Sequence, residues 1–193
     1  MEGGARKDFR MSKPEPYLKK LYDERIAPEL AEEFALKNRH QIPRLVKIVI
    51  NSAIGSDADK AFVQEVQKEI SLIAGQKSVP TKAGKSISNF KLRKGMVVGA
   101  KVTLRARNMY EFFLKLKDVV LPKIRDFRGI PNKMDGHGNY SIGINDHTIF
   151  PEINIDRERK LIGMDIAFVT TAKDDKQGHA LLAKFGLPFR KRI

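Results

Sequence analysis

The sequence predicts an α+β fold, a two-layer sandwich in which helices pack on one face of a largely antiparallel sheet and the other face is basic. Two observations predict it. Segments with apolar residues at helical spacing flank segments in which apolar and polar residues alternate, as they do in half-buried strands. The alternating segments also place lysine, arginine and amide side chains opposite their apolar ones. Helices should therefore cover the apolar side of the sheet.

Length and composition indicate one folded domain. The chain has 193 residues, of which 41% are hydrophobic, and this is enough to bury a core. Residues 1–14 mix glycines and charges without an apolar period, so we expect a disordered N-terminal arm there and a single α+β domain over residues 15–193. The chain has no cysteine, which excludes disulfides and thiolate metal sites and fits a reducing cytosol.

A sequence pI of about 10.0 makes an anionic membrane surface the second choice of partner after nucleic acid, but no lipidation signal supports it. No apolar run reaches the roughly 18 residues of a membrane helix. The first 14 residues also lack the apolar core of a secretion signal. We therefore expect a soluble, unprocessed protein located in the cytoplasm.

The first elements are a helix, a strand and a second helix. From Pro16 the apolar residues follow a helical period up to Phe34, and Pro28 should break or restart this helix. Residues 44–51 alternate as a strand that points Val46, Ile48 and Ile50 to one side and Lys47, Val49 and Asn51 to the other. Ser56 and Asp57 can cap a helix over residues 58–74, and Gly75 should end it.

After a loop of small and basic residues, 78–86, two further strands are predicted. In residues 88–94 the apolar side holds Phe90 and Leu92, and the polar side holds Asn89, Lys91 and Arg93. In residues 97–107 the apolar side holds Val98, Ala100, Val102, Leu104 and Ala106, and the polar side holds Lys101, Thr103, Arg105 and Arg107. Paired in one sheet, these strands would form an apolar back and a cationic front.

The second half of the chain alternates helix and strand signals. Asn108 should cap a helix that ends before Pro122. Residues 123–150 are rich in glycine and contain one short strand near residues 140–144. A strand over residues 164–170 and a short helix over residues 174–185 complete the pattern.

Charge indicates the class of partner. The formal net charge is +14, and residues 71–110 hold nine basic residues and no acidic one. These residues are Lys77, Lys82, Lys85, Lys91, Arg93, Lys94, Lys101, Arg105 and Arg107. A cationic block interleaved with apolar residues predicts a folded surface that binds a phosphate backbone. Amide and hydroxyl groups among the cations favour RNA over DNA, and the inward direction predicted for Phe90 argues against base stacking.

Other chemistries lack their motifs. Residues 83–86, Ala-Gly-Lys-Ser, resemble the end of a nucleotide-binding loop, but Val79 stands where its first glycine is required. The four histidines show no metal-ligand spacing, and residues 135–139 lack the further acids of a calcium loop. No nucleophile elbow is present. We therefore expect neither an enzyme nor a bound metal or cofactor. A free-standing RNA chaperone remains a rival, and competition by unrelated RNA would distinguish it.

Eight motifs follow one another at residues 43–51, 74–77, 81–87, 89–93, 99–105, 126–129, 150–153 and 163–166. Together they resemble one family, the bacterial form of ribosomal large-subunit protein five, which binds 5S ribosomal RNA. The resemblance covers residues 17–192.

This resemblance implies a structural, non-enzymatic component of the central protuberance of the large subunit. Its implied partners are 5S and 23S ribosomal RNA, peptidyl-site transfer RNA, neighbouring large-subunit proteins and a small-subunit protein across an intersubunit bridge. The implied polar contacts to 5S RNA are Asn51, Gln76 and Thr103, with Lys47, Lys101 and Arg105 at phosphates. The predicted strand over residues 88–94 adds Lys91 and Arg93 to this RNA-binding face.

Two further regions take roles from the resemblance. A mobile loop over residues 77–88 would reach the transfer RNA, and its candidate contacts are Lys77, Thr81, Lys82, Lys85 and Ser86. Residues 140–159 would form the face toward the bridge.

Overall fold

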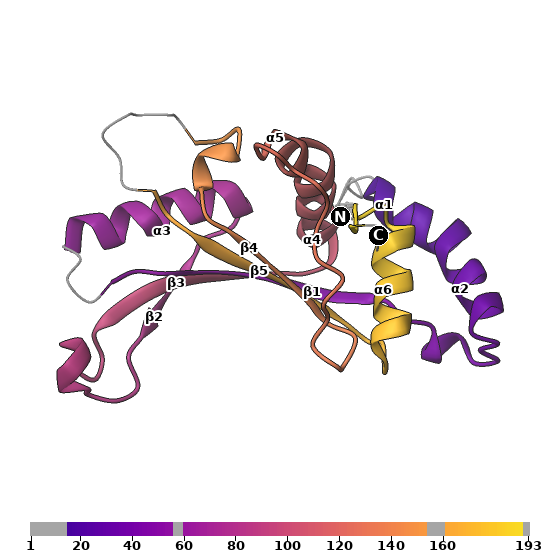
Figure 1. Cartoon of the computed structure of the whole chain (residues 1–193), viewed down its shortest axis with the longest axis horizontal. Helices are drawn as coiled ribbons and strands as arrows, with labels where there is room; N and C mark the ends of the chain where they lie inside the picture. The colour runs from indigo at the N-terminus through magenta and orange to yellow at the C-terminus, as the bar shows by residue number, and fades with distance from the viewer. Residues whose placement is uncertain (1–14, 56–59, 154–160, 191–193) are drawn as a thin grey trace, which may run out of the picture.

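Five antiparallel strands form the single sheet of the computed structural model, which describes residues 15–55, 60–153 and 161–190 (Figure 1). The strands are β1 (Leu45–Ala53), β2 (Val79–Lys82), β3 (Val97–Leu104), β4 (Tyr140–Ile144) and β5 (Met164–Thr170). Their order across the sheet is β2-β3-β1-β5-β4. The first strand in the chain is therefore central, and both of its neighbours come from later in the sequence.

The helices precede, separate and follow these strands. The α-helices are α1 (Tyr17–Leu21), α2 (Ala27–Glu33), α3 (Lys60–Ala74), α4 (Ala106–Lys115), α5 (Leu121–Lys123) and α6 (Asp175–Lys184). Two π-helical turns are η1 (Tyr22–Ile26) and η4 (Leu116–Val120). Three 3₁₀ turns are η2 (Arg39–Gln41), η3 (Ser88–Phe90) and η5 (His147–Ile149).

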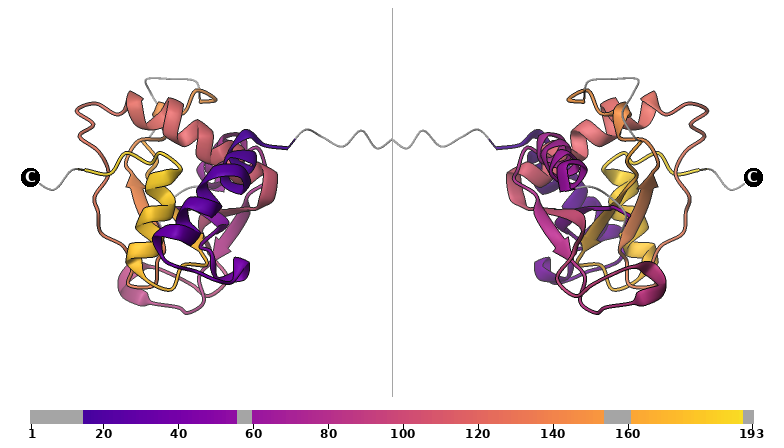
Figure 2. Two further views of the ribbon diagram at one scale, coloured as in Figure 1. Left: turned by 90° about the vertical axis from the view of Figure 1, so that its right-hand side faces the viewer. Right: turned by 90° about the vertical axis from the view of Figure 1, so that its left-hand side faces the viewer.

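The α-helices are confined to one layer and one end of the molecule. Helices α3 and α4 lie over one face of the sheet, while α1, α2 and α6 pack together at one end (Figures 1 and 2). Within the described ranges no α-helix lies against the opposite face, which we call the open face. This arrangement confirms the predicted two-layer α+β fold. The domain boundaries stay a prediction, and the arm at residues 1–14 lies outside the described residues.

The core lies between the helices and the apolar side of the sheet. Phe113 of α4 is fully buried, and its ring centroid lies 5.6 Å from that of Phe168 in β5 and 5.4 Å from that of Phe185 after α6. These contacts join the sheet to both groups of helices, because the three rings come from three different elements. In β1, Ile48 and Ile50 are fully buried beneath the helices.

Both predicted proline breaks are accommodated by π-helical turns. The π turn η1 ends two residues before Pro28, and η4 ends two residues before Pro122. Proline lacks an N–H and its ring crowds the carbonyl four residues earlier, so a wider turn before it relieves the clash. The helical run continues through Pro28 with a changed hydrogen-bond register. The prediction that the later helix ends before Pro122 is wrong, because α5 continues through the proline and ends at Lys123.

Three other predictions need correction. Residues 88–94 are not a strand: they contain the turn η3, and Lys91 has a left-handed backbone with φ 52°. The strand predicted over residues 97–107 ends at Leu104, because α4 begins at Ala106 rather than after Asn108. The loop predicted over residues 78–86 contains the edge strand β2. Proline is tolerated at an edge because no neighbouring strand requires its N–H, which explains Pro80 in β2.

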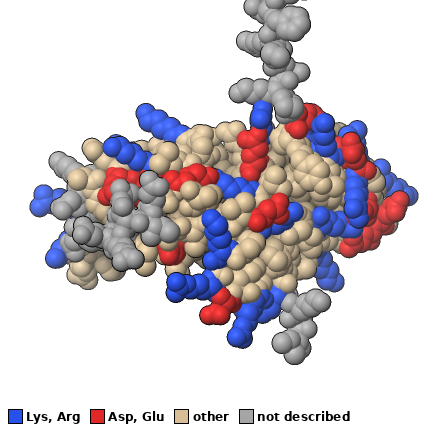
Figure 3. All heavy atoms as spheres, turned by 90° about the horizontal axis from the view of Figure 1, so that it is seen from above, with Lys and Arg blue, Asp and Glu red and all other residues tan. Residues whose placement is uncertain are grey.

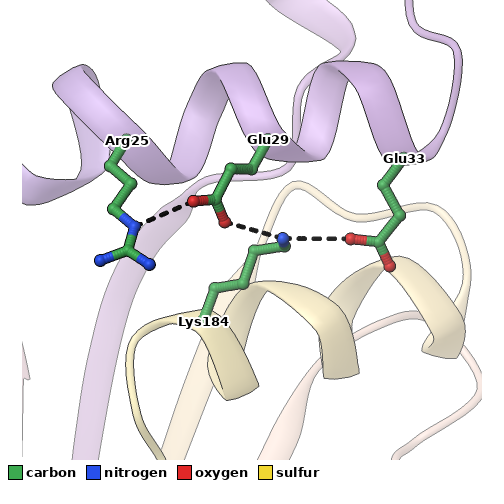
Figure 4. A network of polar contacts seen from close by, with 4 residues as sticks. All are labelled: Arg25, Glu29, Glu33 and Lys184. Atoms are coloured by element: carbon green, nitrogen blue, oxygen red, sulfur yellow. Dashed lines mark hydrogen bonds and ion pairs between the residues drawn. The ribbon is translucent and has the colours of Figure 1, made fainter.

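The N- and C-terminal helices are joined by ion pairs. The Lys184 ammonium of α6 lies 2.9 Å from a carboxylate oxygen of Glu29 and 3.3 Å from one of Glu33, both on α2 (Figure 4). The guanidinium of Arg25 donates to the other oxygen of Glu29 at 2.9 Å. Tyr22 strengthens the same contact, since its ring stacks on Phe185 at 5.9 Å. Burial raises the pKa of Tyr22 to about 12, and its hydroxyl donates to the Pro43 carbonyl.

Two sequence expectations fall partly or wholly outside the described residues. The helix cap predicted at Ser56 and Asp57 lies in the gap at residues 56–59. Part of the predicted bridge face, residues 154–160, lies in another gap. Across the described residues, no helix has the length and apolar character needed to cross a bilayer.

Candidate nucleic-acid interface

A polar row crosses the centre of the open face. The register places Lys101 of β3 opposite Asn51 of β1, and Asn51 opposite Asp165 of β5. Directly opposed side chains on neighbouring strands lie about 4.5–5.5 Å apart at Cβ, so these three form adjacent pairs. Val79 of β2 extends the row on one side and Gly143 of β4 extends it on the other. The row offers an ammonium, an amide and a carboxylate to one ligand.

The neighbouring rows carry the other predicted side chains. Thr103 lies opposite Val49, and Lys47 lies opposite Val169. Arg105 follows β3 in an extended conformation, φ −137° and ψ 162°, so the alternation of the strand continues and turns it to the open face. Lys101 and Arg105 are exposed, whereas Lys47, Asn51 and Thr103 are half-buried. The structure thus brings together five of the residues that strand alternation selected. Arg107, predicted on the same face, lies instead in α4, where it pairs with Glu111.

Gln76 reaches the same region from the end of α3. Gly75 ends this helix with φ 62°, a left-handed conformation that favours glycine. Ser78 then turns the chain back, because its hydroxyl donates to the Gln67 carbonyl at 2.8 Å and its N–H donates to Ser71 Oγ at 3.0 Å. Between these anchors, Gln76 Nε2 lies 3.4 Å from the carbonyl oxygen of Thr103.

A lysine from the helical layer fixes the position of this corner. Lys115 of α4 donates to the Ile73 carbonyl at 2.6 Å and pairs with Glu152 at 2.6 Å. Ile73 belongs to the last turn of α3, whose carbonyls have no partner within the helix. The same ammonium lies 5.5 Å from the ring centroid of Phe112. The end of α3, and Gln76 beyond it, is therefore held from the opposite side of the sheet.

Residues 83–96 form a protrusion between β2 and β3, which we call the excursion. It projects beyond the sheet on the side opposite α4 (Figures 1 and 2). Its base is closed by hydrogen bonds from Ala83 N–H to the Met96 carbonyl and from Gly95 N–H to the Ala83 carbonyl. Its tip is closed by a reciprocal pair of hydrogen bonds between Ile87 and Leu92, both 3.0 Å.

Several candidate residues therefore lie on the excursion rather than on the sheet. Lys91 and Arg93 were predicted on a strand of the basic face, and that placement is wrong, since both are exposed at the tip. The inward direction predicted for Phe90 is also wrong, because 65% of this residue is exposed. The Asn89–Arg93 pattern has a period of two, but the turn η3 and the left-handed Lys91 break the strand.

The candidate contacts for transfer RNA occupy different settings. Lys77, Lys82 and Lys85 are exposed, from the start of β2 to the excursion. Thr81 is half-buried and its hydroxyl oxygen is buried beside β3. Ser86 is exposed, but its hydroxyl accepts the Lys94 N–H at 2.9 Å, so this group also closes the excursion.

Asp165 is the residue that sequence reasoning missed. It lies on the open face and is exposed, so this face is not free of acids. The signal was available, because the predicted strand over residues 164–170 turns Met164 and Ile166 inward and Asp165 outward. The helix side also carries both signs of charge, and its acidic and basic side chains are interspersed (Figure 3).

Comparisons with known proteins agree with this geometry. A family model described as "Ribosomal protein L5" matches residues 38–93, and a second model, described as the C-terminus of the same ribosomal family, matches residues 97–189. The chain is 55% identical over 176 residues to a protein of Thermosipho africanus named "Large ribosomal subunit protein uL5", covering 90% of this chain and 97% of the relative. Relatives of the same name from Parabacteroides distasonis and Thermotoga maritima are 55% and 52% identical, covering 90% of this chain and 94% and 96% of those proteins.

The fold and the open face define an α+β protein with one helix-covered face and one face of cations and amides, a surface suited to a polyanion. The relatives match it along nearly their whole length. The chain belongs to the ribosomal protein L5 family. The predicted resemblance is thereby confirmed, and the protein is a structural ribosomal protein rather than an enzyme.

Proposed function

We propose that this protein binds 5S ribosomal RNA through its open face and anchors it, together with 23S ribosomal RNA, in the central protuberance of the large ribosomal subunit. As a member of the ribosomal L5 family it is a structural constituent of the large subunit and acts in translation. The observation that carries the finer proposal is the juxtaposition of Asn51, Lys101 and Thr103 on two adjacent strands, with Gln76 beside them.

The open face separates two kinds of contact. Lys47, Lys101 and Arg105 carry long, charged side chains that suit phosphate oxygens and fix the position of the protein on the RNA backbone. Asn51 and Thr103 are short and half-buried, so they can hydrogen-bond only with groups that approach the sheet closely. Base edges and ribose 2′-hydroxyl groups of an unpaired RNA loop fit this requirement.

The excursion provides a second RNA contact in this proposal. Its exposed cations extend the basic surface away from the sheet, where Lys85 reaches the backbone of peptidyl-site transfer RNA. Lys82 at the end of β2 contacts the same backbone, and Lys77 before β2 lies at the start of this basic path. Thr81 and Ser86 contribute mainly by shaping this segment, since the hydroxyl of Thr81 is buried and that of Ser86 accepts a backbone N–H. Lys91 and Arg93 sit at the tip and add charge there.

The remaining partners are protein and RNA surfaces of the assembled ribosome. The segment after β4 carries η5, and the part of residues 140–159 that the structure describes lies at the edge of the sheet away from the excursion (Figure 1). We assign to this segment the contact with a small-subunit protein in the intersubunit bridge. Neighbouring large-subunit proteins and 23S ribosomal RNA complete the set of proposed partners.

The decisive experiment is a titration of the purified chain against 5S ribosomal RNA, with an excess of an unrelated structured RNA as competitor. Wild-type binding should survive the competitor. Asn51→Ala and Thr103→Ala should each weaken 5S binding by about 1–3 kcal/mol, because each leaves a buried partner unpaired. Binding to the unrelated RNA should change less, since that binding depends on charge.

Gln64→Ala serves as the matched control, because Gln64 is an exposed amide on α3, on the other side of the sheet. It should leave 5S affinity unchanged. Binding that the competitor abolishes, or equal losses on both RNAs in the Asn51 and Thr103 variants, would reduce the protein to a general basic RNA binder and contradict the proposal.

A further inference from the structure

An aromatic side chain lies exposed at the tip of the excursion. Phe90 is 65% exposed and its neighbour Ile87 is 43% exposed, although both are large and apolar. Among the described residues, the other exposed aromatic side chain of similar accessibility is Tyr17 of α1, at 66%. An apolar ring exposed to water at the end of a protrusion contributes no hydrophobic free energy to the fold. A partner that covers the ring would gain this free energy on binding.

The backbone around Phe90 is fixed before any partner binds. Phe90 ends the turn η3, which is closed by the hydrogen bond from Lys91 N–H to the Ser88 carbonyl at 2.9 Å. The two hydrogen bonds between Ile87 and Leu92 close the tip below it. Binding therefore requires little ordering of the backbone, which favours affinity.

The charges around the ring select its partner. The excursion, residues 83–96, contains Lys85, Lys91, Arg93 and Lys94 and no acidic residue. A protein partner would have to cover the ring and also neutralise four cations. The apolar area that it could bury is small, because it consists of one ring and one aliphatic neighbour. An RNA base satisfies both requirements, because its flat π-face covers the ring while its flanking phosphates meet the cations.

We propose that Phe90 stacks on an exposed base of structured RNA, at an unpaired position or at the open end of a helix, while the surrounding cations hold the adjacent phosphates. This inference rests on the proposed function, since it gives the RNA contact of the excursion its chemistry. It replaces a contact made by charge alone with one that recognises an accessible base.

The test uses the full chain and two RNA probes, a transfer RNA and a long, fully paired RNA duplex in which almost every base is enclosed in the stack. Base stacking on an aromatic side chain contributes about 1–3 kcal/mol, so Phe90→Ala should weaken transfer-RNA binding about five- to 150-fold. Phe90→Tyr should restore most of the affinity, and Phe90→Leu, apolar but without a π-face, should not. Binding to the duplex should change little.

Salt dependence separates the ring from the charges. Phe90→Ala should leave the slope of log affinity against log salt unchanged, because no phosphate contact is lost. Lys85→Ala and Lys94→Ala should lower that slope by about one unit each. A slope that falls as much for Phe90→Ala as for Lys85→Ala would overturn the proposal, as would wild-type affinity of Phe90→Leu.

The chain contains no tryptophan, so Phe90→Trp creates a single fluorescent reporter. Stacking on a base should quench this fluorescence on addition of transfer RNA. Tyr17→Trp is the matched control, because Tyr17 is equally exposed but lies on α1 at the other end of the molecule. Equal quenching in both variants would overturn the proposal, and so would a response of Phe90→Trp to phosphatidylserine vesicles but not to RNA.

Failure of this inference can be told from failure of the proposed function. If Asn51→Ala weakens 5S binding while every Phe90 variant binds transfer RNA as the wild type does, only the stacking proposal fails. If the wild-type chain shows no preference for 5S RNA, the proposed function fails, whatever the Phe90 variants do.

Discussion

At the scale of single residues, Asp165 divides the open face into two parts. Its carboxylate lies next to Asn51, while Lys101 lies on the other side of the same amide. A carboxylate repels phosphate, so in the proposed complex the RNA backbone contacts of this face fall to Lys47, Lys101 and Arg105. Lys101 and Asp165 are two strands apart, about 9–10 Å, and within the described residues they form no ion pair with each other.

The phosphate role proposed for Lys101 and Arg105 gives the first prediction at this scale. Lys101→Ala combined with Arg105→Ala should weaken binding to all RNAs and lower the slope of log affinity against log salt by roughly one unit for each lost contact. The slope is measured by titration at several salt concentrations. Lys68→Ala, an exposed lysine on α3 of the helical layer, should leave the slope unchanged. An unchanged slope in the double variant would rule out the assignment.

Gly178 gives a second prediction, because here packing overrides helix propensity. In an isolated helix alanine is favoured over glycine by about 1 kcal/mol. In α6, however, a Cβ on Gly178 would overlap the backbone carbonyl of Gly138 and crowd Met134. Gly178→Ala should therefore destabilise the protein by about 1–3 kcal/mol, measured by urea unfolding.

A second glycine variant distinguishes this effect from a general effect of alanine. Gly84 in the excursion has open space around its Cβ position. Gly84→Ala should be neutral or slightly stabilising, since it restricts only the unfolded chain. Stabilisation by Gly178→Ala would contradict this prediction, because it would show that α6 packs against the Gly138 turn less tightly than the structure indicates.

The direction of a side chain was predicted well where strand alternation determines it. It was predicted poorly where a single unusual backbone angle determines it. Lys47, Asn51 and Thr103 follow from a period of two and lie on the open face as predicted. The direction of Phe90 depends on the left-handed conformation of Lys91. A lysine seldom adopts that conformation, so the local sequence pattern could not predict it.

At the scale of elements, the α2–α6 contact predicts a pH dependence. Hydrogen bonds from Lys184 and then Arg25 lower the pKa of Glu29 below its ordinary value of 4.5, and the hydrogen bond to Glu29 raises the pKa of Lys184 above 10.5. A carboxylate with a lowered pKa stabilises the fold above its unfolded value and loses that effect as pH falls through its folded value. A lysine with a raised pKa contributes fully below its unfolded value and loses the effect as pH rises through its folded value.

Lys184→Met should therefore lower the urea midpoint slightly at neutral pH and less at an acidic pH below the lowered pKa of Glu29, where this carboxylate is protonated. Equilibrium unfolding at both values measures the difference. Lys173→Met, which changes an exposed lysine before α6, is the control and should behave as the wild type at both. A deficit that is as large in acid as at neutral pH would show that Lys184 acts through packing of its aliphatic stem.

Elements with strong periodicity were predictable, and those defined by their neighbours were not. The alternation in β5 and the stripe of α3 were found from the sequence, because each buries one side. Strand β2 was missed, since Pro80 argues against a strand and only its edge position permits one. The π turns before Pro28 and Pro122 could not be predicted either, because they arise from how a helix relieves the clash between a proline ring and the preceding turn.

At the scale of the whole molecule, the formal charge of +14 gives salt two opposite effects. Salt screens repulsion among the cations, over a Debye length of about 10 Å at 0.1 M, so sodium chloride should raise the unfolding midpoint of the free protein. The same salt should weaken RNA binding. Thermal unfolding and RNA titration across one salt series test this pairing, and a midpoint that falls with salt would contradict it.

The fold class followed from the sequence, but the strand order did not. Alternation shows that a strand has two different sides, and it does not show which strand pairs with which. The central position of β1 depends on pairing with β3 and with β5, whose residues lie far along the chain. The corner at Gln76 depends on Lys115 in the same way, since that lysine is remote in sequence. Such long-range choices are made by the packing of the complete core.

The strand order also bears on how the protein is made. Strand β3 inserts between β2 and β1, so the two segments matched by separate family models, residues 38–93 and 97–189, interleave in one sheet. During synthesis β1 is the first strand to emerge, and both of its edges stay unpaired until β3 pairs with one edge and β5 pairs with the other. Asn51 meets Lys101 and Asp165 only when translation has passed β5. A polypeptide released before β5 therefore lacks Asp165 and one of the two strands that cover β1, so it can form only the Asn51–Lys101 part of the polar row.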